Sequence, residues 1–122
     1  MKFHLSPSDG NIVTGMGPGW IRIGAEEFRE SIVLGADTIV RHWAPSGFDA
    51  LTEADFAGLL VHLPEIVLLG TGAALRFPHP SVTRALVDAR VGIEVMDTPA
   101  ACRTFNILAS EGRKVVAALI VD

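Results

Sequence analysis

The sequence has few of the residues on which covalent and metal chemistry depends. Cys102 is the single cysteine among 122 residues, so no internal disulfide is possible, which fits a reducing compartment. No nucleophile elbow, Walker loop or carboxylate pair with catalytic spacing is present. The four histidines lack the close spacing of metal ligands: His4, His42, His62 and His79. We therefore expect no metal site, no cofactor and no catalytic residue that the sequence can identify.

Excess positive charge and long hydrophobic runs are also absent. Lys and Arg number 10 against 14 Asp and Glu, and this net charge of -4 argues against nucleic acid as a partner. The late apolar run from Val115 to Val121 is far shorter than the ~20 residues of a membrane helix. The start of the chain resembles no secretory signal. We expect a small soluble, cytoplasmic protein that does not insert into a membrane.

The remaining composition is that of one ordinary globular domain. Hydrophobic residues make up 49% of the chain, enough for a single core at this length. Residues 1–19 are rich in Gly, Pro and Ser and predict a flexible arm, and residues 20–122 predict a single α/β domain. Its first part contains three short β-branched segments that favour an antiparallel meander: Trp20–Ile23, Ser31–Leu34 and Thr38–Trp43.

The second half predicts strands and helices in alternation. Thr52 and Asp55 resemble a helix-start capping pair, and the apolar stripe that follows ends at Pro64. Residues 65–70 are almost continuously apolar, which is typical of a strand buried on both faces. A helix begins after Ser81 as N-cap and ends at Gly92 in the left-handed conformation.

The last third is the most specific part of the chain. A strand over residues 93–96 is followed by a helix with Thr98 as N-cap and Pro99 in its first position, which ends at Gly112. A final strand covers residues 115–121. The second half is thus β-α-β-α-β, a pattern that packs right-handed onto a mainly parallel sheet.

Gly70, Thr71 and Gly72 directly follow the buried strand. Open α/β sheets usually bind ligands at the carboxyl ends of their strands, so this turn is a candidate site. It is no dinucleotide fingerprint, because Leu75 stands where a third glycine or alanine belongs. A tight turn without a ligand is the alternative interpretation.

Two arginines and an asparagine extend this candidate. Arg103 and Asn106 share one stripe of the last helix, and Arg76 follows the glycine turn. With the N-terminus of the helix they suggest a site for a carboxylate or phosphate. A solvated helix face explains Arg103 and Asn106 equally well. Cys102 lies in the first turns of the same helix, where a thiol can be reactive, but its apolar neighbours favour a core position.

The last third resembles a known family. The segment Gly92–Thr98, the helix from Ala101 to Leu108 and Glu111–Val115 are similar to a family of small domains of unknown function. That family includes the mitochondrial NADH:ubiquinone oxidoreductase (complex I) assembly factor and bacterial stand-alone relatives. Residues 66–72 and 21–34 resemble its other segments. The resemblance implies a three-layer α/β domain with mixed sheets, a role in assembly of a membrane complex for mitochondrial members, and no established enzymatic activity.

Two hypotheses follow from these observations. The first is a non-catalytic binding or assembly domain with a protein partner, and the family resemblance implies a membrane complex as that partner. The second is a protein or enzyme that binds a small anion through six residues: Gly70, Thr71, Gly72, Arg76, Arg103 and Asn106.

Overall fold

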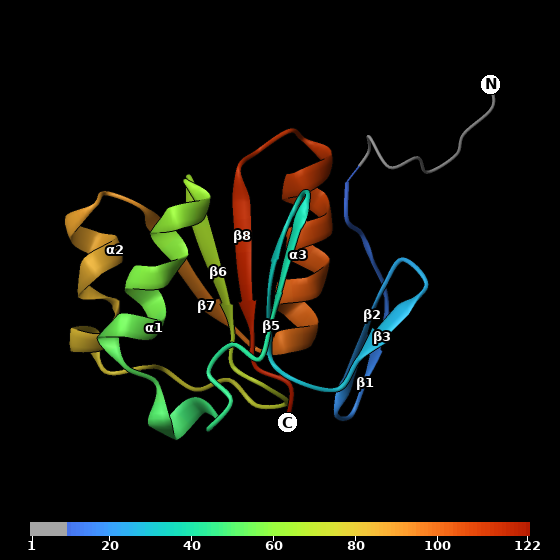
Figure 1. Ribbon diagram of the computed structural model, residues 1–122, viewed down its shortest axis with the longest axis horizontal. Coiled ribbons are helices and arrows are strands. Elements are labelled where there is room, and N and C mark those ends of the chain that lie inside the picture. The colour runs from blue at the N-terminus through green and yellow to red at the C-terminus, as the bar shows by residue number, and fades with distance from the viewer. Residues whose placement is uncertain (1–9) are drawn as a thin grey trace.

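The computed structural model describes residues 10–122 as one α/β domain built in three layers (Figure 1). The middle layer is a five-stranded sheet of order β5-β4-β8-β6-β7. Its strands are β4 (Ile32–Gly35), β5 (Thr38–Arg41), β6 (Ile66–Gly70), β7 (Gly92–Met96) and β8 (Val115–Leu119). Two short helices, α1 (Glu53–Ala57) and α2 (Arg84–Asp88), cover one face. The long helix α3 (Thr98–Ser110) covers the other face, with a three-stranded sheet packed beside it.

Side-chain alternation along β6 explains why both faces of the sheet are covered. Val67 and Leu69 join one core with Phe56 of α1 and Leu86 of α2. Leu68 points to the opposite face and joins a second core with α3 and the small sheet. A strand buried on both faces is what the continuous apolar run predicted, and that prediction is confirmed.

The strand pairing of the second half is also as predicted. β6 pairs in parallel with β7 on one side and with β8 on the other. Gly70 is therefore in register with Met96 and Leu119, so three strands end at one edge of the sheet. β4 and β5 extend the sheet in antiparallel pairing, which makes it mixed.

The predicted meander divides between two sheets. β2 (Trp20–Ile23) pairs with β1 (Val13–Gly17) and β3 (Glu26–Phe28) in the small antiparallel sheet, whereas β4 and β5 belong to the large one. Alternation along the chain indicated these strands but not their partners, because pairing depends on contacts distant in sequence.

The domain also starts earlier than residue 20. β1 lies inside the range predicted as an arm, and residues 1–9 are outside the described part. The glycines that suggested a loop have a packing role instead. A Cβ atom on Gly17 would lie 2.5 Å from the Trp20 indole nitrogen, and one on Gly15 would lie 2.5 Å from the Arg22 guanidinium. Glycine thus makes room for two large cross-strand side chains.

Three predicted helix boundaries are corrected, whereas the Thr52 and Asp55 capping box is present as predicted. The 3-10 turn before α2 is capped by His79, whose ring accepts from the Ser81 amide. Arg90, not Gly92, takes the left-handed conformation after α2 (φ 60°), and Gly92 opens β7.

Asp97 caps α3 through the Ala100 amide, so that Thr98 is already helical. In each case the observed boundary residue lies one or two positions from the predicted one, a difference that is common at helix ends.

Candidate functional site

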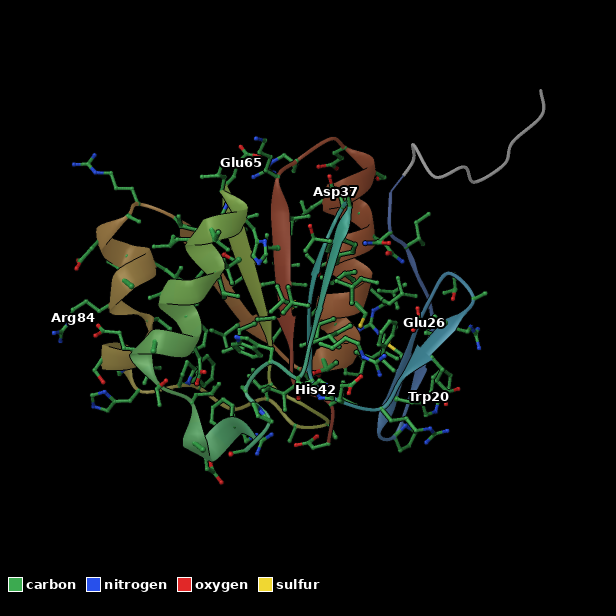
Figure 2. All side chains as sticks on the ribbon, in the orientation of Figure 1. Trp20, Glu26, Asp37, His42, Glu65 and Arg84 are labelled. Carbon is green, nitrogen blue, oxygen red and sulfur yellow. The ribbon has the colours of Figure 1, made fainter. Side chains whose placement is uncertain are left out.

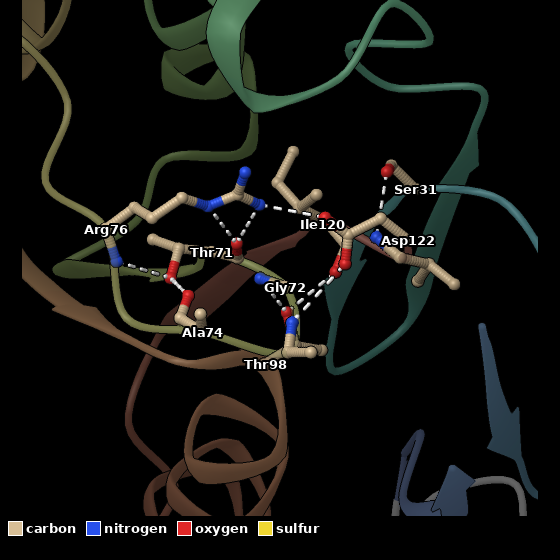
Figure 3. A network of polar contacts seen from close by, with 10 residues as sticks. Ser31, Thr71, Gly72, Ala74, Arg76, Thr98, Ile120 and Asp122 are labelled. Carbon is tan, nitrogen blue, oxygen red and sulfur yellow. Dashed lines mark hydrogen bonds and ion pairs between the residues drawn. The ribbon is translucent and has the colours of Figure 1, made fainter. Parts of the chain in front are cut away.

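The turn after β6 and the start of α3 are directly bonded to each other. The Gly72 amide donates to the Thr98 hydroxyl at 2.8 Å, and the Thr98 amide donates back to the Gly72 carbonyl at 2.9 Å. The same hydroxyl donates to the Ile120 carbonyl at 2.7 Å, which links the end of β8 to both (Figure 3). Thr98 is buried, so the junction is shielded from water. The proximity that the β-α-β pattern predicted for these two places is therefore present.

Arg76 fixes the loop that follows Gly72. Its guanidinium donates twice to the Thr71 carbonyl and pairs with Asp122 at 2.8 Å (Figure 3). The guanidinium also lies 4.6 Å from the ring centroid of Phe48, within cation-π range. The Thr71 hydroxyl donates to the Ala74 carbonyl and accepts from the Arg76 amide. These contacts make Arg76 an anchor of the loop, with its charge matched by Asp122.

The N-terminus of α3 has its backbone donors occupied within the described chain. The Thr98 amide bonds to Gly72, and Pro99 has no N–H group. The amides of Ala100 and Ala101 bond to the side chain and the carbonyl of Asp97. Anions at a helix N-terminus are normally bound by these backbone amides. Because the amides of α3 are already hydrogen-bonded, few donors remain for an anion.

Arg103 and Asn106 lie on α3 but serve different environments. The Asn106 side chain accepts from the Val13 amide and donates to the Val13 carbonyl, both at 2.9 Å. It therefore attaches β1 to α3. Arg103 is exposed. The structure thus brings Gly70, Thr71, Gly72 and Arg76 together at one edge of the sheet, while Asn106 holds the small sheet and Arg103 faces solvent.

A cavity of about 310 Å³ opens beside this junction. It lies between the β1–β2 hairpin and the edge where β6 and β8 end, and Gly72 and Thr98 are part of its wall. Most of its lining is apolar: Met16, Pro18, Trp20, Ile21, Pro99 and Val121. Asp122 supplies the one charged side chain among the described residues that line it. The cavity occupies the position at which open α/β sheets commonly bind ligands.

Cys102 belongs to the core of the molecule. Its side chain is fully buried among α3, the small sheet and the large sheet. Burial raises the pKa of the thiol to about 12, although the nearby Arg103 charge acts in the opposite direction. The burial of Cys102 confirms the prediction of a core thiol. Its raised pKa also disfavours the thiolate, which is the reactive form.

Metal clusters and membrane-spanning helices are two features that residues 10–122 do not contain. No group of three or more His, Cys, Asp or Glu side chains is placed to hold a metal ion. Within the same residues, no helix has the length and apolar character required to span a bilayer.

Sequence reasoning missed Asp122 and the wall formed by the β1–β2 hairpin. Asp122 closely follows β8, whose parallel pairing with β6 brings it beside Gly72. The rule that parallel strands end at one edge was a signal that could have found it. No sequence signal indicated that the β1–β2 hairpin lines the cavity. Met16 and Trp20 lie at the cavity because of how the small sheet packs on the rest of the domain.

The fold is that of a small three-layer α/β domain with a mixed five-stranded sheet, and in this chain the turn after β6 is bonded to the start of α3. The chain belongs to the family described as "Protein of unknown function (DUF498/DUF598)", which matches residues 13–120. The resemblance read from the last third of the sequence is thereby confirmed.

Relatives and solved structures agree with this membership. NADH dehydrogenase [ubiquinone] 1 alpha subcomplex assembly factor 3 of Mus musculus is 41% identical over 90 residues, 72% of this chain and 48% of the mouse protein. The chain thus spans about half the length of this relative. An uncharacterized protein of Rhodobacter capsulatus is 34% identical, covering 88% of this chain and 82% of its own. A crystal structure from Bordetella parapertussis superposes with a TM-score of 0.83 at 38% identity, covering 93% and 97% of the two chains.

Proposed function

We propose that this protein is a non-catalytic accessory domain that binds a protein partner during assembly of a membrane protein complex, from the cytoplasmic side. The observation that carries the proposal is its 41% identity over 90 residues to an assembly factor named for NADH dehydrogenase. Assembly factors act through protein contacts, so the proposal requires a surface that favours binding.

The loop between β6 and α2 supplies such a surface. Leu75 is 53% exposed and Phe77 is 72% exposed. Large apolar side chains of this kind are frequent anchors in protein interfaces. They gain binding free energy when water is excluded from them.

The same loop is ordered before any partner binds. Arg76 stands between Leu75 and Phe77 in sequence, and its contacts with Thr71, Asp122 and Phe48 hold the backbone in place. A loop that is already fixed loses less conformational entropy on binding, which favours affinity. We therefore assign the partner contact to the surface formed by Leu75 and Phe77.

Capture of partners from solubilised membranes of the source cell tests the assignment. The tagged protein is compared with the double variant Leu75→Ser and Phe77→Ser, and captured proteins are identified by mass spectrometry. We expect the unaltered chain to enrich subunits of a respiratory NADH dehydrogenase or another defined membrane complex, and the variant to lose them.

The chain offers a matched control at the other end of the sheet. Val61 and Leu63 are 76% and 72% exposed, and they precede Glu65, which lies far from His42 and the carboxyl edge (Figure 2). The control variant Val61→Ser and Leu63→Ser should capture the same subunits as the unaltered chain. Equal loss in both double variants, or no specific membrane protein with the unaltered chain, contradicts the proposal.

A further inference from the structure

The cavity beside the Gly72 and Thr98 junction has the dimensions of a ligand site. Ligand pockets usually begin at roughly 300 Å³, and a dry cavity of about 150 Å³ in another protein holds benzene. The volume of about 310 Å³ therefore accommodates one aromatic ring with a substituent.

The walls of the cavity are held in place without a ligand. On one side, the Trp20 ring packs across the hairpin onto Gly17, where any Cβ atom would collide with it, and the Arg22 guanidinium lies 5.7 Å from the Trp20 ring centroid. On the other side, Thr98 joins Gly72 to Ile120. Both walls are built from internal contacts, so a ligand would enter a preformed space.

The polar atoms around the cavity are largely committed to one another. The Gly72 amide and the Ile120 carbonyl both bond to the Thr98 hydroxyl. The Val121 amide bonds to the Ser31 hydroxyl at 3.0 Å (Figure 3). These groups leave the floor apolar in character, so a ligand would be held there mainly by removal of apolar surface from water.

Asp122 is the exception. Its carboxylate accepts from the Ala73 amide and from Arg76, and its side chain is still 48% exposed. An ionised carboxylate has about four acceptor positions, so capacity for a further donor remains. The mouth of the cavity therefore offers an acceptor to a hydrogen-bond donor, which differs from the anion site suggested by Arg76 and Arg103.

We propose that this cavity binds a small, mainly apolar molecule of about one aromatic ring, oriented by a hydroxyl or amino group that donates to the Asp122 carboxylate. The assignment is independent of the protein-partner surface at Leu75 and Phe77. It gives the domain a small-molecule site in addition to an assembly role.

Three probes that share one ring and differ in charge test the proposal. Benzyl alcohol, benzylamine and benzoate are titrated to millimolar concentration into the ¹⁵N-labelled protein, and amide shifts are followed by NMR. We expect saturable shifts at Trp20, Ile21, Gly72, Ala73 and Thr98 with the first two probes. Benzoate should bind several-fold more weakly than benzyl alcohol, because its carboxylate has no hydrogen to donate to Asp122.

Two variants and a matched control locate the site. Ala73→Phe places a ring at the cavity mouth from an exposed position and should abolish the shifts. Ala74→Phe makes the same change at the adjacent exposed residue, which does not line the cavity, and should leave probe binding unchanged. Asp122→Asn should weaken benzylamine while benzyl alcohol still binds.

The outcomes separate clearly. Absence of saturable shifts with all three probes, or shifts that cluster away from the cavity, overturns the proposal. Strongest binding by benzoate at the cavity overturns the role of Asp122 and supports an anion site instead. Retained binding in Ala73→Phe, with that variant folded by its NMR spectrum, places the probes elsewhere and also overturns it.

Discussion

The amides of Gly72 and Thr98 each donate a hydrogen bond to the other residue, at 2.8 and 2.9 Å, across 26 positions of sequence. This reciprocal pair joins the turn after β6 to the first turn of α3. It positions the loop that carries Leu75 and Phe77 and forms one wall of the cavity.

Replacing Thr98 by Val should destabilise the domain strongly. The change keeps the shape of the side chain but leaves the Gly72 amide and the Ile120 carbonyl without their buried partner. Each unsatisfied group costs about 1–3 kcal/mol, so we expect the two together to lower the free energy of unfolding by about 2–6 kcal/mol, measured by urea denaturation. Thr98→Ser keeps the hydroxyl and should cost less than half as much. Equal stability of the Val and Ser variants would contradict the role of the hydroxyl.

Gly72→Ala tests the close approach at the turn. Gly72 has φ of 99°, and an added Cβ atom would lie 2.5 Å from Asp122 Oδ1. Strain of this kind costs about 1–3 kcal/mol before the collision with Asp122 is counted. Gly58→Ala is the control, because Gly58 has φ of -61° and open space around it, and alanine there should be neutral or slightly stabilising. Similar melting temperatures for the two variants would argue against the geometry of the turn.

Asn106→Ala should loosen the small sheet more than the rest of the domain. The side chain makes two hydrogen bonds with the Val13 backbone, and their loss should cost about 1–3 kcal/mol. Hydrogen exchange should show faster exchange in β1 and β2 than in β6 and β8. The exposed Arg103, changed to Ala on the same helix, should alter stability by less than about 0.5 kcal/mol. Uniform exchange across both sheets in Asn106→Ala would exclude this attachment role.

Cys102 should resist thiol reagents in the native protein. Burial raises its pKa from 9.0 to about 12, so at pH 8 it is a protonated and inaccessible thiol. The native protein should react with a chromogenic disulfide only as fast as it unfolds, whereas the denatured chain should react at once. Rapid reaction under native conditions would show that the helix opens locally.

The same shift predicts how stability depends on pH. Between pH 9 and about 12 the unfolded chain loses the thiol proton and the folded chain retains it, so the unfolded state binds fewer protons and the free energy of unfolding falls as pH rises. Below pH 9 the thiol contributes no slope. The difference in stability between the unaltered chain and Cys102→Ala should therefore shrink as the pH rises above 9. A constant difference across this range would show that the thiol does not titrate on unfolding.

Periodicity and capping signals were enough to predict the second half of the fold. The continuous apolar run at residues 66–70 and the stripe of α3 indicated the β-α-β order, and that order alone placed Gly72 near Thr98. The first half was harder to predict, because the partners of β2 and β4 are set by side chains distant in sequence. Gly15 and Gly17 suggested a loop for the same reason that they are suited to β1, namely that they lack a side chain.

The sequence predicted that the Gly70–Gly72 turn and the start of α3 are neighbours, but not which side chains surround Arg76. Residue types suggested an anion site from Arg76 and the α3 terminus, but only coordinates show that Asp122 and Thr71 bind the guanidinium and that Asp97 caps the helix. Charge pairing at this edge of the sheet depends on which chain segments are in contact there. A single sequence does not specify those contacts. The role of Asn106 could not be predicted for the same reason, because its hydrogen-bond partner, Val13, is distant in sequence.

The most direct test of the central claim is site-specific photocrosslinking in cells. A benzophenone amino acid is placed at Phe77 and, separately, at the equally exposed Leu63 at the opposite end of β6. We expect a discrete crosslink from position 77 to a subunit of a membrane complex and none to that subunit from position 63. The same crosslinks from both positions, or a crosslink to such a subunit from position 63 alone, would contradict it.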